Sequence, residues 1–388
     1  MDMKVASMTE RISGKTLVQK RGDEQVSLSL LRRQTRRSVC IVQGQCMLEI
    51  AVMEDRGKMV LKRNKTPPQT QRPSMTMNRF DSWFRGDGDG FSTLARLQEH
   101  KKVVTGIALP AGSDKLFSGS TDGTVRIWDC HSGQCVNVIN LGSQVTSLIS
   151  EGPWVFVGLR NSVKAWNIQT ASEFTLDGPK GQVLAMTVGN DTLFAGAEDG
   201  VISAWRGSSE TRSPVELIAS LRGHTKAVVC LTVGCERLYS GSMDHSIKVW
   251  DLNTLECKMT LNEHTDVVTS LICWNNYLLS SSYDCTIKVW GATEEGTLKV
   301  TYTHTEENGV LALCGMTVPE DKHILFCSCR DNSVGLYELP SFSEMGRLFA
   351  RKEVRSLEKG PGGLLFTGDG TGLLTVWKWL NEPKGACS

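Results

Sequence analysis

A serine, an aspartate and a histidine occur within six positions of the segment LYSGSMDHSIKVWDL, residues 238–252. A second histidine, His224, precedes them in LRGH. These residue types make up hydrolase triads, in which histidine takes the proton of a serine that attacks a carbonyl carbon. Nucleophilic hydrolysis is therefore the first chemistry to test for this segment.

The same residue types recur at matched spacing in three parts of the chain. The three complete sets are His100, Ser118, Asp122, Trp128; His224, Ser240, Asp244, Trp250; and His264, Ser280, Asp284, Trp290. An enzyme needs one nucleophile rather than three copies, and no GxSxG elbow surrounds any of these serines. The repetition favours a structural role, and we expect a non-enzymatic protein.

The tryptophans of these sets belong to a repeat that runs through most of the chain. The repeated segment ends at Trp128, Trp166, Trp205, Trp250, Trp290, Tyr337 and Trp377. The period is about 40 residues, and each unit contains short runs rich in β-branched and aromatic residues, such as RLYSGS, separated by turn residues. Seven such units predict an all-β fold, a β-propeller with seven four-stranded blades.

The segments LYSGSMDHSIKVWD and LFSGSTDGTVRIWD, with the upstream LRGH, LNEH and LQEH, resemble WD40 repeats over residues 91–380. The resemblance implies a seven-bladed WD40 β-propeller in which each complete set forms a buried structural tetrad of hydrogen bonds. The other four repeats lack members and are expected to rely on packing. The sixth has His304, Asp331 and Tyr337 with Cys327 for serine, and the seventh has Thr371 for aspartate.

WD40 repeats are offset from blades, so the strand before the first histidine belongs to the last blade. Residues 91–97, FSTLARL, are therefore predicted to close the seventh blade, which otherwise exposes a sheet edge. The propeller is predicted to span residues 91–380 and to be monomeric, followed by a C-terminal tail at 381–388.

Residues 1–90 differ in composition from the rest of the chain. They carry 17 Lys and Arg against 10 Asp and Glu, whereas residues 91–388 carry 26 against 32. This split predicts a mostly disordered basic N-terminal arm, with a linker at TPPQTQRP (66–73) and a flexible joint at RGDGDG (85–90).

Segments such as SEGPWVFVG and GPGGLLFTGDGTG resemble the plant proteins that join a CCCH zinc finger to seven WD40 repeats. The resemblance places the remnant of a finger at residues 40–83, with Cys40 and Cys46 as its first two ligands and Asp81 where the histidine belongs. Structural zinc takes four ligands. No confident cofactor is therefore expected, and zinc only if the finger is completed. The segment 47–80 is either a genuine insertion or a splicing or gene-model artefact.

Four arginines in LLRRQTRR, namely Arg32, Arg33, Arg36 and Arg37, could contact the phosphates of RNA or DNA. The alternative interpretation, which is favoured, is a solvated basic tail or a nuclear localisation patch. The 13 scattered cysteines, read as reduced thiols, and the lack of a signal peptide or apolar span indicate an intracellular protein, with the nucleus favoured over the cytoplasm and no membrane contact. Cys327 and Cys329 could touch one metal ion, but core thiols are favoured.

WD40 rings dock protein or peptide partners on the face near their tight loops, and the resemblance assigns positions of each repeat to that face. The candidate residues are Thr121, Glu198, Met243, Tyr283, Arg330 and Arg355. Methionine, tyrosine and arginine are typical of binding hot spots. We therefore predict an interaction scaffold that binds a peptide with an apolar anchor and an acidic flank. The alternative is an RNA- or DNA-associated protein whose basic arm contacts the nucleic acid.

Overall fold

The computed structural model describes residues 90–207, 215–318 and 322–380, and the backbone of 39–41, 50–53 and 59–60. The chain divides into two compact units, Met1–Thr76 and Met77–Ser388. In the first unit, three short strands pair antiparallel in the order β1 (Val39–Ile41), β2 (Ile50–Met53) and β3 (Met59–Val60).

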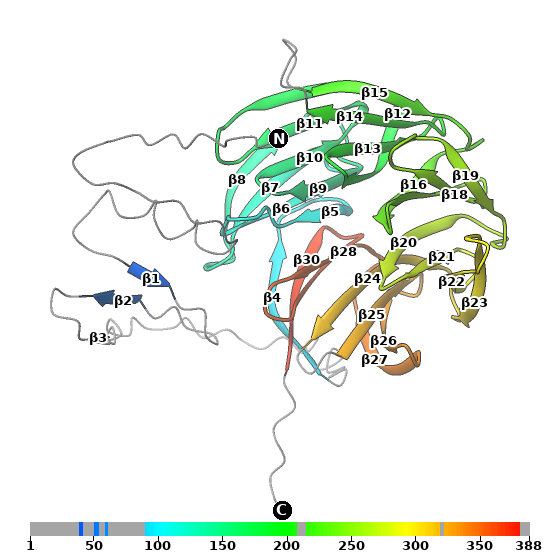
Figure 1. The fold of residues 1–388 in the computed structure, drawn as a ribbon. Helices are drawn as coiled ribbons and strands as arrows, with labels where there is room; N and C mark the ends of the chain where they lie inside the picture. Colours follow the sequence, from blue (N-terminus) through cyan, green and yellow to red (C-terminus); the bar gives the residue numbers. More distant parts are fainter. Residues whose placement is uncertain are drawn as a thin grey trace, which may run out of the picture. The chain divides into compact units, whose positions relative to one another are not determined.

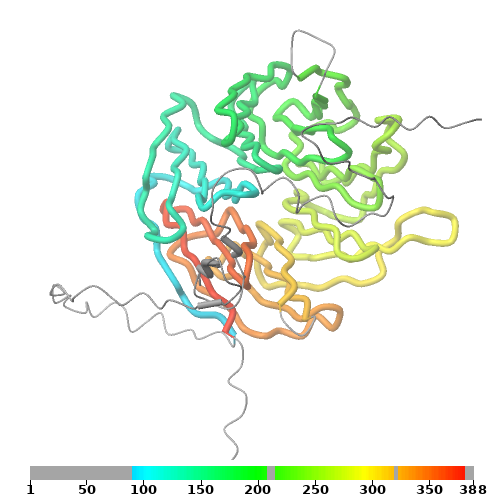
Figure 2. The backbone as a smooth tube through the Cα atoms, turned by 60° about the vertical axis from the view of Figure 1, so that its left-hand side comes forward, coloured from blue at the N-terminus to red at the C-terminus, as the bar shows by residue number. Residues whose placement is uncertain are grey.

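The second unit is the predicted seven-bladed propeller, with blades arranged around a centre (Figures 1 and 2). Each blade is an antiparallel sheet whose first strand is innermost. Blade one comprises β5 (Val104–Ala108), β6 (Lys115–Ser120), β7 (Thr124–Asp129) and β8 (Cys135–Asn140). Blade four comprises β16 (Val228–Gly234), β17 (Arg237–Ser242), β18 (Ile247–Asp251) and β19 (Cys257–Leu261).

Blades five and six have the same strand order. Blade five comprises β20 (Val268–Trp274), β21 (Tyr277–Ser282), β22 (Thr286–Ala292) and β23 (Leu298–Thr305). Blade six comprises β24 (Val310–Val318), β25 (Lys322–Cys329), β26 (Ser333–Leu339) and β27 (Ser343–Phe349).

Blades two and three share one long strand, β12 (Glu173–Gly189). Its first half pairs with β11 (Arg160–Asn167), beside β10 (Trp154–Gly158) and β9 (Ser147–Glu151). Its second half pairs with β13 (Thr192–Ala197), followed by β14 (Ile202–Gly207) and β15 (Val215–Leu221). In blade one, the tetrad histidine His100 stands three residues after Leu97 of the preceding outer strand. The corresponding position after Leu176 is Pro179, so the connection between blades two and three has no tetrad histidine.

The first strand of the propeller closes its last blade. β4 (Phe91–Gln98) pairs antiparallel with β30 (Leu373–Trp379), next to β29 (Leu364–Asp369) and β28 (Val354–Gly360). Figure 1 shows β4 in cyan beside the red β30. The Phe91 ring packs edge-on against Phe326 and Trp379, with centroids 5.5 and 5.0 Å away.

The apolar core lies between neighbouring blades. Between blades four and five, for example, Val249 packs in one cluster with Val268 and Trp290. Gly241 permits this approach, since a Cβ there would lie 2.6 Å from Cγ1 of Val268. Among the described residues, no helix is long and apolar enough to cross a membrane.

Candidate functional site

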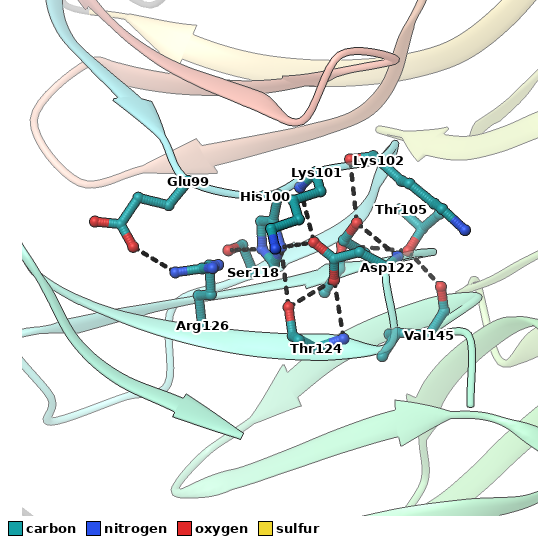
Figure 3. A network of polar contacts seen from close by, with 12 residues as sticks. Glu99, His100, Lys101, Lys102, Thr105, Ser118, Asp122, Thr124, Arg126 and Val145 are labelled. Atoms are coloured by element: carbon teal, nitrogen blue, oxygen red, sulfur yellow. Dashed lines mark hydrogen bonds and ion pairs between the residues drawn. The ribbon is translucent and has the colours of Figure 1, made fainter. Parts of the chain in front are cut away.

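The structure brings the first predicted set together at the entrance to blade one, and Figure 3 shows its His100, Ser118 and Asp122. His100, in the loop between β4 and β5, has Nε2 2.8 Å from Oγ of Ser118 and Nδ1 3.0 Å from Oδ2 of Asp122. The indole N–H of Trp128 donates to the same Ser118 oxygen at 2.8 Å. Because an ionised Asp122 only accepts, the proton of a neutral imidazole belongs on Nδ1, and the Ser118 hydroxyl donates to Nε2.

The same geometry recurs in blades four and five. The histidine-to-serine distances are 2.8 Å at His224 and 2.7 Å at His264, and the histidine-to-aspartate distances are 2.9 and 2.8 Å. Trp250 and Trp290 each donate to their serine at 2.8 Å. Each set has a fifth member that was not predicted from the sequence. It is the hydroxyl of Thr124, Ser246 or Thr286, which donates to the aspartate at 2.6 Å.

Burial and hydrogen bonding set the charge states of these sets. Burial lowers the pKa of His100 and His224, which the neighbouring aspartates only partly oppose. Burial would raise the pKa of Asp122, but hydrogen bonds from Thr124, Lys101 and His100 outweigh it and hold the pKa at about 2. The three serine side chains are fully buried and already hydrogen-bonded. The arrangement therefore ties loops to strands and offers no accessible nucleophile.

The sixth blade contains a different polar network. Glu306, in the loop between β23 and β24, has a side chain 2% exposed and pairs with Arg347 at 2.9 Å. The Tyr337 hydroxyl donates to the other Glu306 oxygen, and Arg347 donates to the Tyr337 oxygen at 3.1 Å. The expectation that this blade relies on packing alone is therefore wrong. The ion pair of Glu306 and Arg347, together with the Tyr337 hydroxyl, occupies the place that the tetrad has in the other blades.

His304 does not join a tetrad, because it still lies on the outer strand β23, where it pairs with Ile287. In blade four, Leu261 has this position opposite Ile247. The tetrad histidine His264 lies three residues beyond Leu261, in the loop that follows the outer strand. The His304 ring packs edge-on against Tyr337 at 4.6 Å instead. Glu306 could have been identified by its position four residues before Val310, which is the spacing of His264 before Val268. Arg347 has no counterpart in the three tetrads.

Glu306, Cys327 and Cys329 form a buried cluster whose ligand atoms lie within 4.8 Å of one another. Both oxygens of Glu306 are engaged by Arg347 and Tyr337, which places a guanidinium beside any cation there. Burial raises the pKa of the Cys327 thiol well above its usual value, which favours the protonated form over a metal-binding thiolate. These contacts support the interpretation of the two cysteines as core thiols.

In the seventh blade, Thr371 stands where the aspartate was expected and Asp369 takes over part of its role. Oδ1 of Asp369 accepts from the backbone and hydroxyl of Thr371, at 2.8 and 2.6 Å. Its Oδ2 is buried and has no hydrogen-bond partner among the residues that the structure describes. Trp377 donates to Thr367 at 3.0 Å, so the tryptophan half of the tetrad remains.

Five of the six predicted face residues lie at one end of the ring. Each is the first residue after the second strand of its blade, and its backbone N–H donates to the residue that precedes or begins the inner strand. The five bonds are Thr121 to Val103 (3.0 Å), Glu198 to Gln182 (2.9 Å), Met243 to Ala227 (3.0 Å), Tyr283 to Val267 (3.1 Å) and Arg330 to Gly309 (3.0 Å). The sixth, Arg355, lies at the start of inner strand β28.

Tyr283, Arg330, Glu353 and Arg355 form a cluster across blades five to seven, here called the Tyr283 cluster. The Arg330 guanidinium lies 5.3 Å from the centroid of the Tyr283 ring, and Arg355 donates to the Tyr283 hydroxyl at 3.3 Å. Glu353 pairs with both arginines. A Cβ at Gly309 would lie 3.2 Å from both Cδ of Arg330 and the Tyr283 carbonyl oxygen, so glycine permits this approach.

The other predicted residues contribute less to this cluster. Met243, on neighbouring blade four, is 40% exposed and adds apolar surface. Glu198 folds back to accept from the Gln182 backbone at 3.0 Å. Thr121, on blade one, is half-buried.

The predictions for the arm cannot be placed on the structure. Arg32, Arg33, Arg36, Arg37 and Cys46 lie outside the described residues, as does the side chain of Cys40. The donor set of a single-chain finger is incomplete in the sequence itself, because no cysteine or histidine occurs between Cys46 and His100. Four-ligand structural zinc does not fit this set.

Comparison with known proteins identifies relatives of the propeller. The family model "WD40: WD domain, G-beta repeat" matches residues 91–129, 215–251 and 255–291, the three ranges that contain complete tetrads. "Zinc finger CCCH domain-containing protein 17" of Oryza sativa subsp. japonica is 59% identical over 292 residues, 75% of this chain and 67% of that protein. "Zinc finger CCCH domain-containing protein 48" of Arabidopsis thaliana is 64% identical over 295 residues, 76% of this chain and 68% of that protein.

A solved structure supports the fold alone. The crystal structure of the WD40 beta propeller domain of Doa1 is similar with a TM-score of 0.63 and 20% sequence identity. The match covers 76% of this chain and 98% of that one.

Proposed function

Because the chain belongs to the plant family of CCCH zinc-finger proteins with WD40 repeats, we propose that it is a non-enzymatic scaffold that docks a partner peptide on the Tyr283 cluster. The observation that carries the proposal is the exposed pair of arginines held against one tyrosine. The side chains of Arg330 and Arg355 are 57% and 41% exposed. Aromatic and arginine side chains dominate the binding energy of protein interfaces.

The charges of the cluster favour an acidic segment of the partner. Two arginines against Glu353 leave a net charge of +1, and the guanidinium groups keep donors free for carboxylates. The neighbouring Met243 offers an apolar contact with flexible shape. A peptide with an apolar anchor next to aspartate or glutamate matches both properties.

Selection from a random displayed peptide library against the full chain tests this function. We expect enrichment of sequences that combine an apolar residue with acidic neighbours. Tyr283→Ala and Arg330→Ala should each weaken binding of the selected peptides by at least about tenfold, as at interface hot spots. Arg206→Ala is the matched control, because Arg206 bonds Thr192 at the opposite end of the ring. Unchanged binding in both alanine variants would show that the cluster is not the docking site.

The alternative function is nucleic-acid association through the basic arm. It is favoured by the charge excess of residues 1–90 and by the CCCH zinc finger in the names of the relatives. Binding of mixed RNA and DNA oligonucleotides should then weaken steeply with salt. Replacing Arg32, Arg33, Arg36 and Arg37 with serine should abolish it. These four arginines also match a nuclear localisation patch, so the nucleus is the proposed compartment.

A further inference from the structure

Blade seven has a glycine at the position from which five other blades present a predicted face residue. Gly370 is the first residue after β29, and its N–H donates to the Glu353 carbonyl oxygen at 2.9 Å. This is the bond that Arg330 makes to Gly309 in blade six. Because glycine has no side chain, nothing rises from this position of blade seven next to the Tyr283 cluster.

Three lysines lie beside this glycine. The stem of Lys352 runs along Gly370, since a Cβ there would lie 3.2 Å from Cβ and 3.6 Å from Cδ of Lys352. Lys101 and Lys102 belong to the loop that enters blade one (Figure 3). That loop packs on blade seven, since a Cβ at Gly372 would lie 2.9 Å from the Lys102 carbonyl oxygen. All three lysines are exposed, and no carboxylate among the described residues pairs with their ammonium groups.

The lysines extend the positive charge of the Tyr283 cluster across blade seven to blade one. This surface, here called the basic track, consists of Arg330, Arg355, Lys352, Lys101 and Lys102 with the carboxylate of Glu353. Five cations and one carboxylate give a net charge of +4. The aromatic ring of the track, Tyr283, already lies under the Arg330 guanidinium, whereas single-stranded nucleic acids bind through rings that stack on their bases. The track therefore favours a peptide rich in carboxylates over a nucleic acid.

We propose that the acidic flank of the partner peptide continues from the Tyr283 cluster over Gly370 to Lys101 and Lys102. The partner is then a segment with several consecutive aspartates or glutamates after its apolar anchor. The missing side chain at Gly370 lets the peptide backbone pass close to blade seven between the arginines and the lysines. This inference rests on the proposed docking function and adds the length and charge of the segment that docks.

Blade four provides the comparison within the molecule. Lys226 has the position of Lys102, because the carbonyl oxygens of both accept from a serine at 3.1 Å. Its loop packs on blade three in the same way, with a Cβ at Gly200 placed 2.9 Å from the Lys226 carbonyl oxygen. Blade three presents Glu198 rather than glycine, so an acidic segment meets a carboxylate there. The same lysine position should therefore contribute to binding only beside blade seven.

Titration of the full chain with two peptides, followed by NMR of the peptide, tests the proposal. The first is acetyl-Gly-Leu-Glu-Glu-Glu-Glu-Gly-amide, and the second keeps only the first glutamate and has glutamine at the other three positions. At low salt we expect the first peptide to bind at least about fivefold more tightly, because several exposed ion pairs add. At about 1 M salt this advantage should disappear, since charges are then screened beyond about 3 Å. Equal affinity of the two peptides at low salt overturns the proposal.

Protein variants then locate the track. Lys102→Gln combined with Lys352→Gln should reduce the advantage of the four-glutamate peptide to less than about twofold and leave the one-glutamate peptide unchanged. The control combines Lys180→Gln with Lys226→Gln, which removes the same charge from exposed lysines at the same end of the ring. The control should keep the full advantage. An equal loss in the two double variants would mean general attraction by charge and would overturn the track.

Arg330→Ala separates this inference from the docking function. If Arg330→Ala weakens both peptides while the parent chain binds them equally, the docking function stands and the track is wrong. If Arg330→Ala changes neither affinity, or if neither peptide binds the parent chain, both proposals are wrong. Binding of an oligouridine that depends on Lys102 and Lys352, with no binding of the peptides, also overturns the inference, because a nucleic acid would then be the ligand.

Discussion

Blades five and six both hold the loop before the inner strand with buried hydrogen bonds, but they use different side chains to do so. In blade five, His264 in the entering loop reaches Asp284 and, through Ser280, the indole of Trp290. In blade six, the entering loop supplies Glu306, which reaches the phenol of Tyr337 and the guanidinium of Arg347 on the outer strand. Both networks tie the loop to the third strand, but only the second extends to the outer strand.

The difference shows what the position requires. The loop needs a buried polar partner on the third strand, and either a neutral imidazole with an aspartate or a glutamate with an arginine provides one. The ion pair of blade six should be more sensitive to substitution, because removing one member of a buried pair leaves the other charge uncompensated. The two blades should therefore respond differently to loss of a single side chain.

The largest effect is expected for Arg347→Met. It leaves the buried Glu306 carboxylate with the Tyr337 hydroxyl as its main donor, and breaking such pairs costs about 3–5 kcal/mol of unfolding free energy. Urea unfolding followed by tryptophan fluorescence measures the loss. The double variant Glu306→Gln, Arg347→Met should recover most of it. A single variant as stable as the parent would mean that the ion pair contributes little.

Ser280→Ala in blade five should cost about 2 kcal/mol, because the Trp290 and His264 side chains both lose a buried partner. Cys327→Ala is the comparison in blade six, since Cys327 faces Leu313 as Ser280 faces Leu271. Its thiol accepts no bond from an indole, so we expect a loss of about 1 kcal/mol from reduced packing. Equal losses in urea unfolding would contradict the assignment of the tetrad.

Acid should weaken blades one and four before blade six. Because the pKa of His100 and His224 is lowered on folding, the unfolded chain binds their protons first, and stability falls as the pH drops below 6.5. Asp122 and Asp244, with folded pKa values of about 2, add a second loss between about pH 4 and pH 2. Hydrogen exchange at pH 7 and pH 5 should show lost protection in β5–β7 and β16–β18 relative to β24–β26. A uniform loss would contradict this order.

The smallest effect is expected for Asp369→Asn in blade seven. The change keeps the oxygen that accepts from Thr371 and replaces the unpaired buried oxygen with a neutral donor group. We expect a gain of up to about 1 kcal/mol in unfolding free energy. Thr371→Val is the control, because it removes only the hydroxyl bond to Asp369 and should destabilise slightly. A loss of stability in Asp369→Asn would show that the second oxygen has a role.

The fold and the three tetrads follow from the sequence because the repeat carries its own hydrogen-bonding residues at constant spacing. The network of blade six could not be predicted in this way. Glu306 stands four residues before Val310 of the inner strand, as His264 stands before Val268, but the repeat motif has histidine at this position. Arg347, 41 residues after Glu306, lies outside the motif.

The pairing of β4 with β30 has a consequence for synthesis of the protein. About 275 residues separate Gln98, the end of one strand, from Leu373, the start of the other. At about 5–20 residues per second, a ribosome needs roughly 14–55 s to make them. Throughout that interval the nascent chain carries β4 with its sheet partner not yet made. The first strand of the propeller must therefore wait for β30, and the seventh blade is completed only after the residues of β30 have been made.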